Sequence, residues 1–295
     1  MKSPPKRQGK LRLKSPAKIT PWVHILGRRS DGYHEVDLCL VPVSLYDELE
    51  IEVLEEGPIR VRVQGGEGLG ALEDNLVLRA ARAIEEELDT EIAADIELVK
   101  RIPWGAGLGG GSGNAAATLL ALNRILGEPV SRPRLTQIAL SLGSDVPFFL
   151  DPRPQRAQGR GERLNPLRQF ANAALIVVKP ALSIPTQQAY ARVRNYGVPW
   201  DDPEPGSFTG LLNSLHNDFE IVLFPVYPVL REIKERVLEL GASGALLSGS
   251  GSAVCGYFET VIRRERALER LSGISDWTLH PCSTLERHEY FAVET

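Results

Sequence analysis

A run of glycines in the middle of the chain has the composition of a phosphate-binding loop. Six of the nine residues from Gly105 to Gly113 are glycine, and the alanine-rich residues 114–126 that follow are predicted to form a helix. Glycine allows the backbone a positive φ and a close approach to a ligand, while a helix start offers N–H groups and the positive end of its dipole. We therefore expect an anion here, and a nucleotide in particular.

Two well-known nucleotide loops are excluded by the residues around the run. A P-loop needs a lysine followed by serine or threonine after its last glycine, whereas Gly111 is followed by Ser112 and Gly113. A protein kinase needs His-Arg-Asp and Asp-Phe-Gly triplets, and the sequence contains neither. The run is therefore neither of these loops.

The dinucleotide-binding fingerprint is matched literally, by Gly105, Gly107 and Gly110, but its context is wrong. Residues 94–102 alternate apolar and polar, which is typical of a half-exposed antiparallel strand and not of the buried first strand of a dinucleotide fold. No strand with an acidic tip follows the helix. A phosphate loop of another type is left, with a nicotinamide-dependent oxidoreductase as the weakest alternative.

Composition limits the classes of protein to which the chain can belong. Its 295 residues are 43% hydrophobic and 24% charged, enough for two domains, and the net charge of −4 argues against a nucleic-acid partner. Cys39, Cys255 and Cys282 are too few and too scattered for a disulfide framework or a zinc site, which favours a reducing, cytoplasmic location. We find neither a signal peptide nor an apolar run of the roughly 18 residues that span a membrane.

The elements that position the loop are predicted to mix strands and helices in two layers, an α+β fold. Residues 1–14 carry basic side chains and no acid, and are predicted to be a basic, flexible tail. Asp74 is expected to cap the helix before the loop, and residues 151–161 and 198–210 are expected to be long loops. Strands are predicted at 38–53, 59–63, 94–102, 174–179, 244–247 and 253–258, and helices at 75–88, 114–126, 135–142 and 229–239.

Five blocks of sequence, in order, resemble the GHMP kinase superfamily, which includes galactokinase, homoserine kinase and mevalonate kinase. The blocks are Pro16-Ala17-Lys18-Ile19 with Gly27 to Glu35, Glu73-Asp74-Asn75-Leu76-Val77, the glycine run, Leu142 to Phe149, and Ile184-Pro185-Thr186 with Ser248 to Ser252. Within the superfamily, Gly32-Tyr33-His34-Glu35 resembles the kinases that phosphorylate the 2-hydroxyl of 4-diphosphocytidyl-2-C-methyl-D-erythritol, a step of the non-mevalonate isoprenoid pathway.

The resemblance implies a two-domain GHMP-kinase fold. Residues 15–167 are expected to form an N-terminal, ribosomal-protein-like α/β sandwich with the ATP loop and the catalytic pair. Residues 168–295 are expected to form a C-terminal, ferredoxin-like α/β domain. The resemblance also implies ATP and Mg²⁺ as cofactors, a small-molecule acceptor, and a monomer or weak homodimer.

The catalytic pair implied by the resemblance is Lys18 and Asp145. Alcohol phosphorylation needs an orienting or basic group for the hydroxyl and positive charge for the phosphoryl group. Asp145 is expected to face the hydroxyl, with Lys18 beside it. The structural alternatives are a turn residue at a helix end for Asp145 and a solvated continuation of the basic tail for Lys18.

The donor site is expected to combine the glycine loop with residues around the adenine. Asn75, Leu76 and Lys100 match positions near the adenine, although a helix start, a core leucine and a surface lysine would look the same. Ser112 is the candidate side chain for a phosphate or for Mg²⁺. The loop residues expected to bind the phosphates are Gly105, Ala106, Gly107, Leu108, Gly109, Gly110, Gly111 and Ser112.

The acceptor site is expected around a cytidine base. His34 is expected to hydrogen-bond the base, with Tyr33 beside it, while Thr186 and Tyr190 close over it; a structured loop and a core tyrosine are the alternatives. The residues expected to enclose the reacting end are Thr20, Gly249, Ser250 and Gly251, the last three in what could equally be a tight structural turn.

Some residues depart from the family pattern. These departures bear on the identity of the acceptor more than on the class of reaction. Thr20-Pro21 stands where the family has Asn-Leu, Gly113 replaces a second serine, and Asp151-Pro152 interrupts a usual glycine. Two further alternatives therefore stay open beside the cytidyl substrate: a GHMP kinase for another small alcohol, and a catalytically silent nucleotide-binding sensor.

Overall fold

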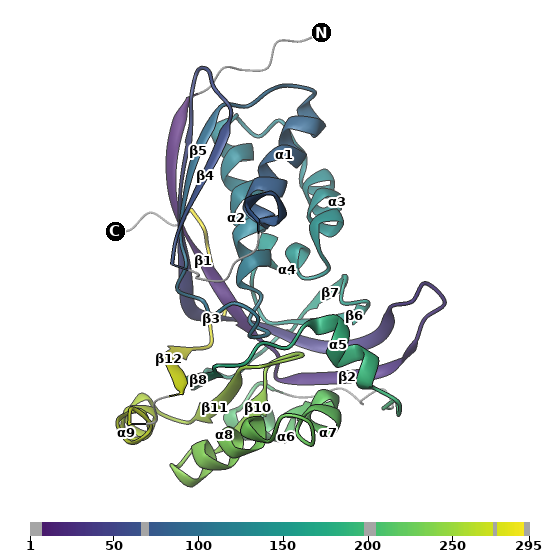
Figure 1. The fold of residues 1–295 in the computed structure, drawn as a ribbon, viewed down its shortest axis with the longest axis vertical. Helices are drawn as coiled ribbons and strands as arrows, with labels where there is room; N and C mark the ends of the chain where they lie inside the picture. Colours follow the sequence, from purple (N-terminus) through teal and green to yellow (C-terminus); the bar gives the residue numbers. More distant parts are fainter. Residues whose placement is uncertain (1–7, 66–70, 198–204, 274–275, 292–295) are drawn as a thin grey trace.

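The structure, a computed structural model, describes residues 8–65, 71–197, 205–273 and 276–291. In Figure 1 these residues form an elongated molecule with two β-sheets and helices packed against them. Strand pairing is mostly antiparallel, and helices and strands are interspersed along the chain. The predicted α+β class is confirmed.

The larger sheet is organised around one long strand, β3. Its strands are β1 (Gly9–Ile19), β2 (Trp22–Arg28), β3 (His34–Val53), β4 (Ile59–Gln64), β5 (Ala94–Val99), β6 (Gln155–Gly159), β7 (Arg163–Pro166) and β9 (His216–Asn217). The first half of β3 pairs with β2 and β6, and its second half pairs with β1 and β5. A single strand therefore connects the two ends of the molecule.

Helices of the first half of the chain cover one face of this sheet (Figure 1). They are the 3₁₀ turn η1 (Leu72–Asp74), α1 (Leu76–Leu88), α2 (Gly110–Ile125), α3 (Arg132–Leu142) and α4 (Val146–Leu150). The central helix α2 is buried on most sides, and Ala115, Ala116, Ala117 and Ala121 are fully buried in it. Small side chains let α2 pack closely on its neighbours, so its N-terminus is firmly held.

The smaller sheet has four antiparallel strands in the order β10-β11-β8-β12. These are β8 (Ala174–Pro180), β10 (Gly244–Leu247), β11 (Val254–Phe258) and β12 (Trp277–Ser283). The helices of this half are α5 (Thr186–Arg192), α6 (Phe208–Asn213), α7 (Asp218–Leu223), α8 (Pro228–Glu239) and α9 (Val261–Leu271). The predicted boundary at residues 167 and 168 falls between β7 and β8.

Segments from the second half of the chain pair with the larger sheet, and the two sheets share a core. The short strand β9 pairs in parallel with β2, and Thr284 bridges to Val43 in β3. Between the sheets lies a buried cluster that includes Trp22, Val177 and Tyr257. Segments from both halves of the chain can therefore contribute to one site.

The prediction of a flexible tail over residues 1–14 is wrong for residues 9–14, because they form the first half of β1. Residues 1–7 lie outside the part of the chain that the structure describes. Leu13 is buried, while Lys10 and Arg12 point outward and pair with Glu50 of β3. Apolar and basic residues alternate here with period two, so one face packs on the core and the other forms ion pairs.

Three further predictions are corrected in detail. Residues 151–161 are not a long loop, because β6 lies within them and pairs with β3. Asn75, not Asp74, caps α1, since its side-chain oxygen accepts a hydrogen bond from Val77 N at 2.9 Å. Helix α2 begins at Gly110, inside the glycine run and four residues earlier than predicted. The loop and the helix N-terminus are thus one continuous feature.

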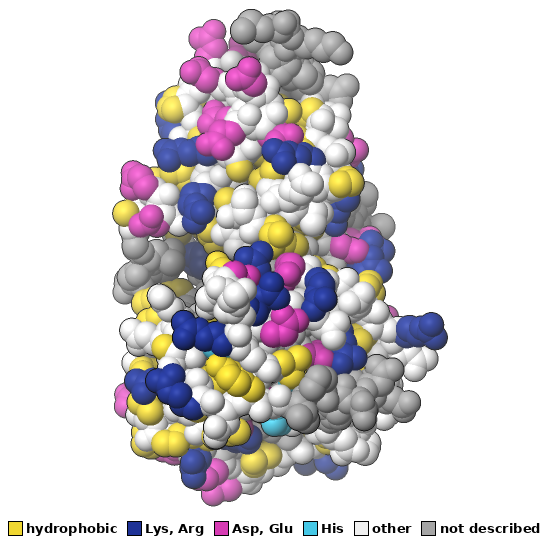
Figure 2. Space-filling model, turned by 90° about the vertical axis from the view of Figure 1, so that its right-hand side faces the viewer, with side chains coloured by type: hydrophobic (Ala, Val, Ile, Leu, Met, Phe, Trp, Pro, Cys, Tyr) yellow, Lys and Arg dark blue, Asp and Glu magenta, His cyan; other side chains and the backbone are white. Residues whose placement is uncertain are grey.

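On the face shown in Figure 2, basic and acidic side chains are intermixed. Among the described residues, no helix is both long enough and apolar enough to cross a membrane.

Candidate active site

A cleft of about 510 Å³ lies at the glycine run. Its walls come from β1, the N-terminus of α1, the loop before α2, the N-terminus of α4, and α5. Among its lining residues are Lys18, Asn75, Leu76, Lys100, Gly105 to Ser112, Asp145, Thr186, Tyr190, Gly249 and Ser250. The cleft therefore brings together most of the site residues that the sequence predicts, from both halves of the chain.

The glycine run needs glycine for its backbone angles and for its close contacts. Gly105, Gly107 and Gly109 have φ values of 61°, 75° and 69°, in the region that side chains disfavour. A Cβ on Gly107 would lie 2.1 Å from the carbonyl oxygen of Ser248. A Cβ on Gly109 would lie 2.8 Å from the ring of Phe149. The loop thus passes through a narrow gap before α2 begins.

Lys18 and Asp145 meet at the floor of the cleft. The Lys18 side chain is only 7% exposed, and its Nζ lies 3.6 Å from Oδ2 of Asp145. Lys18 also donates from Nζ to Thr20 Oγ1 at 3.2 Å and from its backbone N to the Leu108 carbonyl at 2.9 Å. Asp145 is the N-cap residue of α4, and its side chain is 37% exposed. Lys18 is therefore no continuation of a solvated tail.

Aromatic rings gather beside this pair, where a base is expected. The rings of His34 and Tyr190 stack with centroids 4.8 Å apart, and Phe219 meets Tyr190 edge-on at 4.9 Å. Burial and the nearby Asp145 carboxylate raise the pKa of Tyr190 well above its usual range, so its hydroxyl keeps its proton. Burial, and then the charge of Arg28, lower the pKa of His34 and favour the neutral ring.

Tyr33 is more exposed than its neighbour His34. The residue is 52% exposed, and the Arg160 guanidinium lies over its ring, 4.8 Å from the centroid. Neither Tyr33 nor His34 lines the cleft itself; His34 reaches it through Tyr190. The Tyr33 ring therefore packs against Arg160, which directly follows β6.

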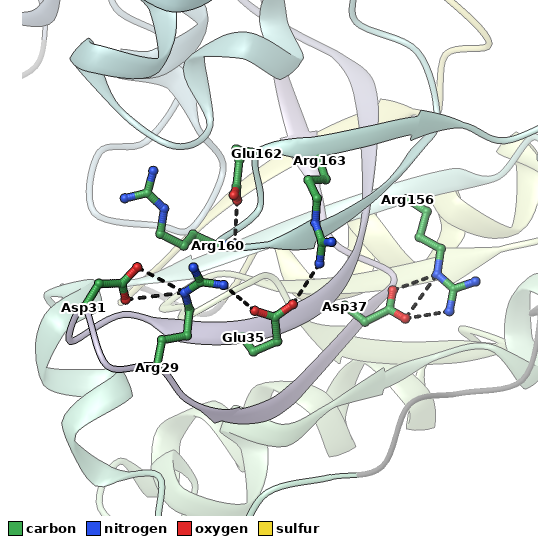
Figure 3. Close-up of polar contacts among 8 residues, drawn as sticks. All are labelled: Arg29, Asp31, Glu35, Asp37, Arg156, Arg160, Glu162 and Arg163. Carbon is green, nitrogen blue, oxygen red and sulfur yellow. Dashed lines mark hydrogen bonds and ion pairs between the residues drawn. The ribbon is translucent and has the colours of Figure 1, made fainter.

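The turn that carries Tyr33 and His34 is fastened by ion pairs, shown in Figure 3. Arg29 binds Asp31 at 3.1 Å and Glu35 at 2.6 Å, and Arg163 of β7 reaches Glu35 at 2.8 Å. The hairpin of β6 and β7 thus supports the turn between β2 and β3. Exposed pairs of this kind contribute little free energy one by one, but several together fix a geometry.

A second glycine cluster, in residues 248–252, lies directly against the first. Thr186 Oγ1 and Ser250 Oγ are 3.0 Å apart, and a Cβ on Gly249 would lie 3.5 Å from Lys18 Nζ. Asn217 Nδ2 donates to the carbonyls of Leu247 and Gly249, both at 2.8 Å. Gly251 belongs to the same turn, with a φ of 82°, but does not line the cleft. Sequence reasoning missed Asn217, whose partners lie about thirty residues away in the sequence.

The residues expected around the adenine line the cleft, but two have side-chain partners inside the protein. Asn75 caps α1, and the Lys100 ammonium forms a buried ion pair with Asp47 of β3. Asp47 was also missed, although a signal existed. Leu49, Ile51 and Val53 alternate on the buried face of β3, and Asp47 continues that alternation as a fully buried carboxylate.

Among the described residues, one cluster of possible metal ligands lies outside the cleft. His24, His216 and Asp218 place three ligand atoms within 4.8 Å of one another. The two imidazoles are nearly parallel, 9° apart with centroids at 4.4 Å, and His216 Nε2 is 2.7 Å from Asp218 Oδ1. Imidazole lone pairs lie in the ring planes, so parallel rings cannot both point at one ion, and this arrangement is not a preformed metal site.

Comparisons with known proteins agree with this geometry. Residues 75–151 match the GHMP kinases N terminal domain and residues 206–273 match the GHMP kinases C terminal model. The 4-diphosphocytidyl-2-C-methyl-D-erythritol kinase of Syntrophotalea carbinolica is 39% identical over 269 residues, which cover 89% of this chain and 95% of that protein. The chain belongs to the 4-diphosphocytidyl-2-C-methyl-D-erythritol kinase family of GHMP kinases.

Other members of this kinase family and solved structures give the same result. The relative from Geobacter sulfurreducens is 39% identical over 266 residues, covering 89% of this chain and 95% of that one. A crystal structure of 4-(cytidine 5'-diphospho)-2C-methyl-D-erythritol kinase matches with a TM-score of 0.78 and 36% identity, covering 92% of this chain and 99% of that chain. Homoserine kinase from Cytophaga hutchinsonii shares the fold. It matches with a TM-score of 0.71 and 16% identity, covering 95% of this chain and 96% of that chain.

Proposed function

We propose that this chain transfers the γ-phosphoryl group of ATP to the 2-hydroxyl of 4-diphosphocytidyl-2-C-methyl-D-erythritol, in the non-mevalonate route to isoprenoids. The observation that carries the proposal is the single cleft in which the glycine loop, the Lys18–Asp145 pair and the acceptor-side residues Thr186 and Tyr190 meet. The family membership of the chain supports the same reaction.

ATP is the phosphate donor that membership of a kinase family implies. Its phosphates bind along the loop from Gly105 to Ser112, where backbone N–H groups and the N-terminus of α2 supply positive potential. The left-handed glycines allow this close approach because no Cβ covers the backbone. The adenine lies toward Asn75 and Leu76 at the start of α1.

Asp145 and Lys18 act on the acceptor hydroxyl and on the phosphoryl group. The Asp145 carboxylate orients the 2-hydroxyl and takes its proton as the oxygen–phosphorus bond forms and the bond to ADP breaks. The Lys18 ammonium, 3.6 Å from that carboxylate, stabilises negative charge on the transferring group. Thr20 Oγ1 accepts a hydrogen bond from Lys18 and so orients the ammonium.

The oxygen donors in the cleft fit Mg²⁺. The hydroxyl of Ser112 and the carboxylate of Asp145 are hard ligands on the same lining, and Mg²⁺ takes few protein ligands beside phosphate oxygens and water. When bound, the ion neutralises phosphate charge. Ser112 is its proposed protein contact.

The cytidine base binds at the ring cluster. The neutral His34 ring can exchange hydrogen bonds with the base, while the stacked Tyr190 ring offers an apolar surface. Thr186, joined to Ser250, closes the cleft over the ligand. Tyr33 and Gly251 lie at the periphery of this acceptor site.

A coupled assay of ADP release tests the proposal. Purified protein is given ATP, Mg²⁺ and one acceptor at a time: the cytidyl substrate, mevalonate, homoserine or galactose. We expect turnover with the cytidyl substrate and little with the others. Turnover of another alcohol alone would refute the assigned acceptor, and ATP binding without turnover of any alcohol would indicate a sensor.

A further inference from the structure

One carboxylate beneath the glycine loop is fully buried, and the proposed mechanism does not use it. Asp47 lies in the middle of β3, with no exposed surface, and does not line the cleft. Its Oδ1 accepts hydrogen bonds from the backbone N of Arg101 at 2.7 Å and of Ile102 at 2.8 Å. Its Oδ2 accepts from Asn114 Nδ2 at 2.8 Å and pairs with the Lys100 ammonium.

These partners stand at the two ends of the phosphate loop. Lys100, Arg101 and Ile102 immediately precede residues 103–113, and Asn114 immediately follows them in α2. A single side chain therefore fastens the entry and the exit of the loop to the central strand of the sheet. Each carboxylate oxygen holds two partners: Oδ1 holds Arg101 and Ile102, and Oδ2 holds Lys100 and Asn114.

The charges at this anchor balance locally. The Lys100 side chain is 6% exposed, and its ammonium neutralises the buried carboxylate, so the loop does not rest on a net negative charge that would repel phosphates. A Cβ on Gly110 would lie 3.2 Å from Lys100 Nζ, which places this ion pair directly under the first residue of α2. Charged hydrogen bonds are the strong ones, and here they hold a segment whose glycines are intrinsically mobile.

We propose that Asp47 is a positioning residue for nucleotide binding: it sets the loop N–H groups at the spacing that the phosphates require. The inference rests on the proposed role of the loop as the ATP site. The Lys100 ammonium then supports the loop through its ion pair with Asp47. Asn114 is the corresponding partner on the helix side.

The test compares Asp47→Asn and Asn114→Ala with wild type, using calorimetric titration with ATP and with AMP. Asp47→Asn removes the charge, and Asn114→Ala removes only the contact at the exit of the loop. Either substitution should raise the Kd for ATP about 10- to 100-fold, the range for a lost hydrogen bond to a charged group. The Kd for AMP should change less, because fewer phosphates contact the loop. The KM for the acceptor should stay within about twofold of wild type.

A matched control separates positioning from general destabilisation. Leu49→Ala removes a buried side chain two residues along the same face of β3, and it should lower the melting temperature while leaving the ATP affinity unchanged. If Asp47→Asn does not fold, Asn114→Ala decides the question alone. Unchanged ATP affinity in the folded variants, or equal losses for ATP and AMP, would overturn the inference.

The experiment distinguishes this proposal from the proposed function, because nucleotide titration requires no acceptor. Weakened ATP binding in Asp47→Asn together with an inactive wild type would refute the assigned reaction and leave the anchor supported. An active wild type, together with variants that keep the wild-type ATP affinity, would support the assigned reaction and refute the anchor.

Discussion

At the scale of single residues, the proposed reaction depends on the spacing of Lys18 and Asp145. Their 3.6 Å separation is longer than a hydrogen bond, so neither group is fully satisfied by the other. Asp145 can therefore accept a proton from a hydroxyl while Lys18 contacts a phosphoryl oxygen. Burial of Lys18 strengthens its effect, because charges interact more strongly away from water.

Asp145→Asn tests the proton-accepting role. The amide keeps the size of the side chain but cannot take the proton, so kcat should fall about 10²- to 10⁴-fold with a modest change in ATP affinity. Steady-state kinetics with both substrates measure this. A kcat near that of wild type would make Asp145 only the N-cap of α4.

His34 gives a prediction for pH. Its pKa lies below the ordinary value of 6.5, so the ring is neutral around pH 7 and gains a proton as the pH falls through that lowered value. The added charge, close to Arg28, should raise the KM for the cytidyl substrate at acidic pH and leave it flat above neutrality.

His34→Ala provides the comparison for that pH profile. The variant should have a raised KM at all pH values, a nearly unchanged kcat, and no rise in KM on acidification, because uniform binding is lost while the phosphoryl centre is untouched. A wild-type KM that stays constant as the pH is lowered from neutrality to the acid limit at which the protein remains folded would contradict the assignment.

At the scale of elements, the loop before α2 acts as a tightly packed unit. Gly107 has a positive φ, and a Cβ there would strike the Ser248 carbonyl, so the two glycine clusters touch. Gly107→Ala should therefore displace the loop and lower kcat/KM for ATP about 100-fold, which is the scale of a displacement of about 1 Å.

Gly27→Ala is the control for that substitution. Among the described residues, nothing lies within 4 Å of a Cβ at Gly27, and the position has no positive φ. Its kcat/KM should match wild type. Equal kinetics for Gly107→Ala and Gly27→Ala would show that the loop tolerates a side chain.

Strand β1 gives a stability prediction that distinguishes it from a flexible tail. Leu13 is 4% exposed, and Leu13→Ala should lower the free energy of unfolding by about 2–5 kcal/mol. Arg12→Ala, at an outward position with an exposed ion pair, should cost less than about 1 kcal/mol. Denaturant unfolding measures both. Indistinguishable curves for the two variants would favour a tail.

The sequence predicts those parts of the site whose signal is local. The glycine run, the helix after it, and the blocks with Lys18 and Asp145 can be read from neighbouring residues. The burial of Asp47 could be read from the alternation of its strand, but the partners of Asp47 and Asn217 could not, because they lie about fifty and thirty residues away in the chain. The alternation that places Leu13 on the core was hidden by the basic residues between its apolar positions.

At the scale of the whole molecule, the cleft is built from both halves of the chain. The first sheet and its helices supply Lys18, Asp145 and the glycine loop, while Thr186 and Ser250 come from segments around the smaller sheet. The pairing of β9 with β2 and the shared core hold these parts together. We therefore propose that ATP and the acceptor bind in this one cleft and react directly.

Direct transfer predicts sequential kinetics. Initial velocities measured while both substrates are varied should give intersecting double-reciprocal lines, because both substrates bind before any product leaves. Parallel lines would indicate a phosphorylated enzyme intermediate and would contradict direct transfer between the two ligands.

The most direct test of the central claim follows the phosphoryl group itself. The protein is incubated with Mg²⁺, ATP labelled in the γ-phosphate, and an equimolar mixture of the cytidyl substrate, mevalonate, homoserine and galactose, and the labelled products are identified by mass spectrometry. We expect the label on the 2-hydroxyl of the cytidyl substrate, and its loss in Asp145→Asn. Label on another alcohol, with none on the cytidyl substrate, would contradict the account.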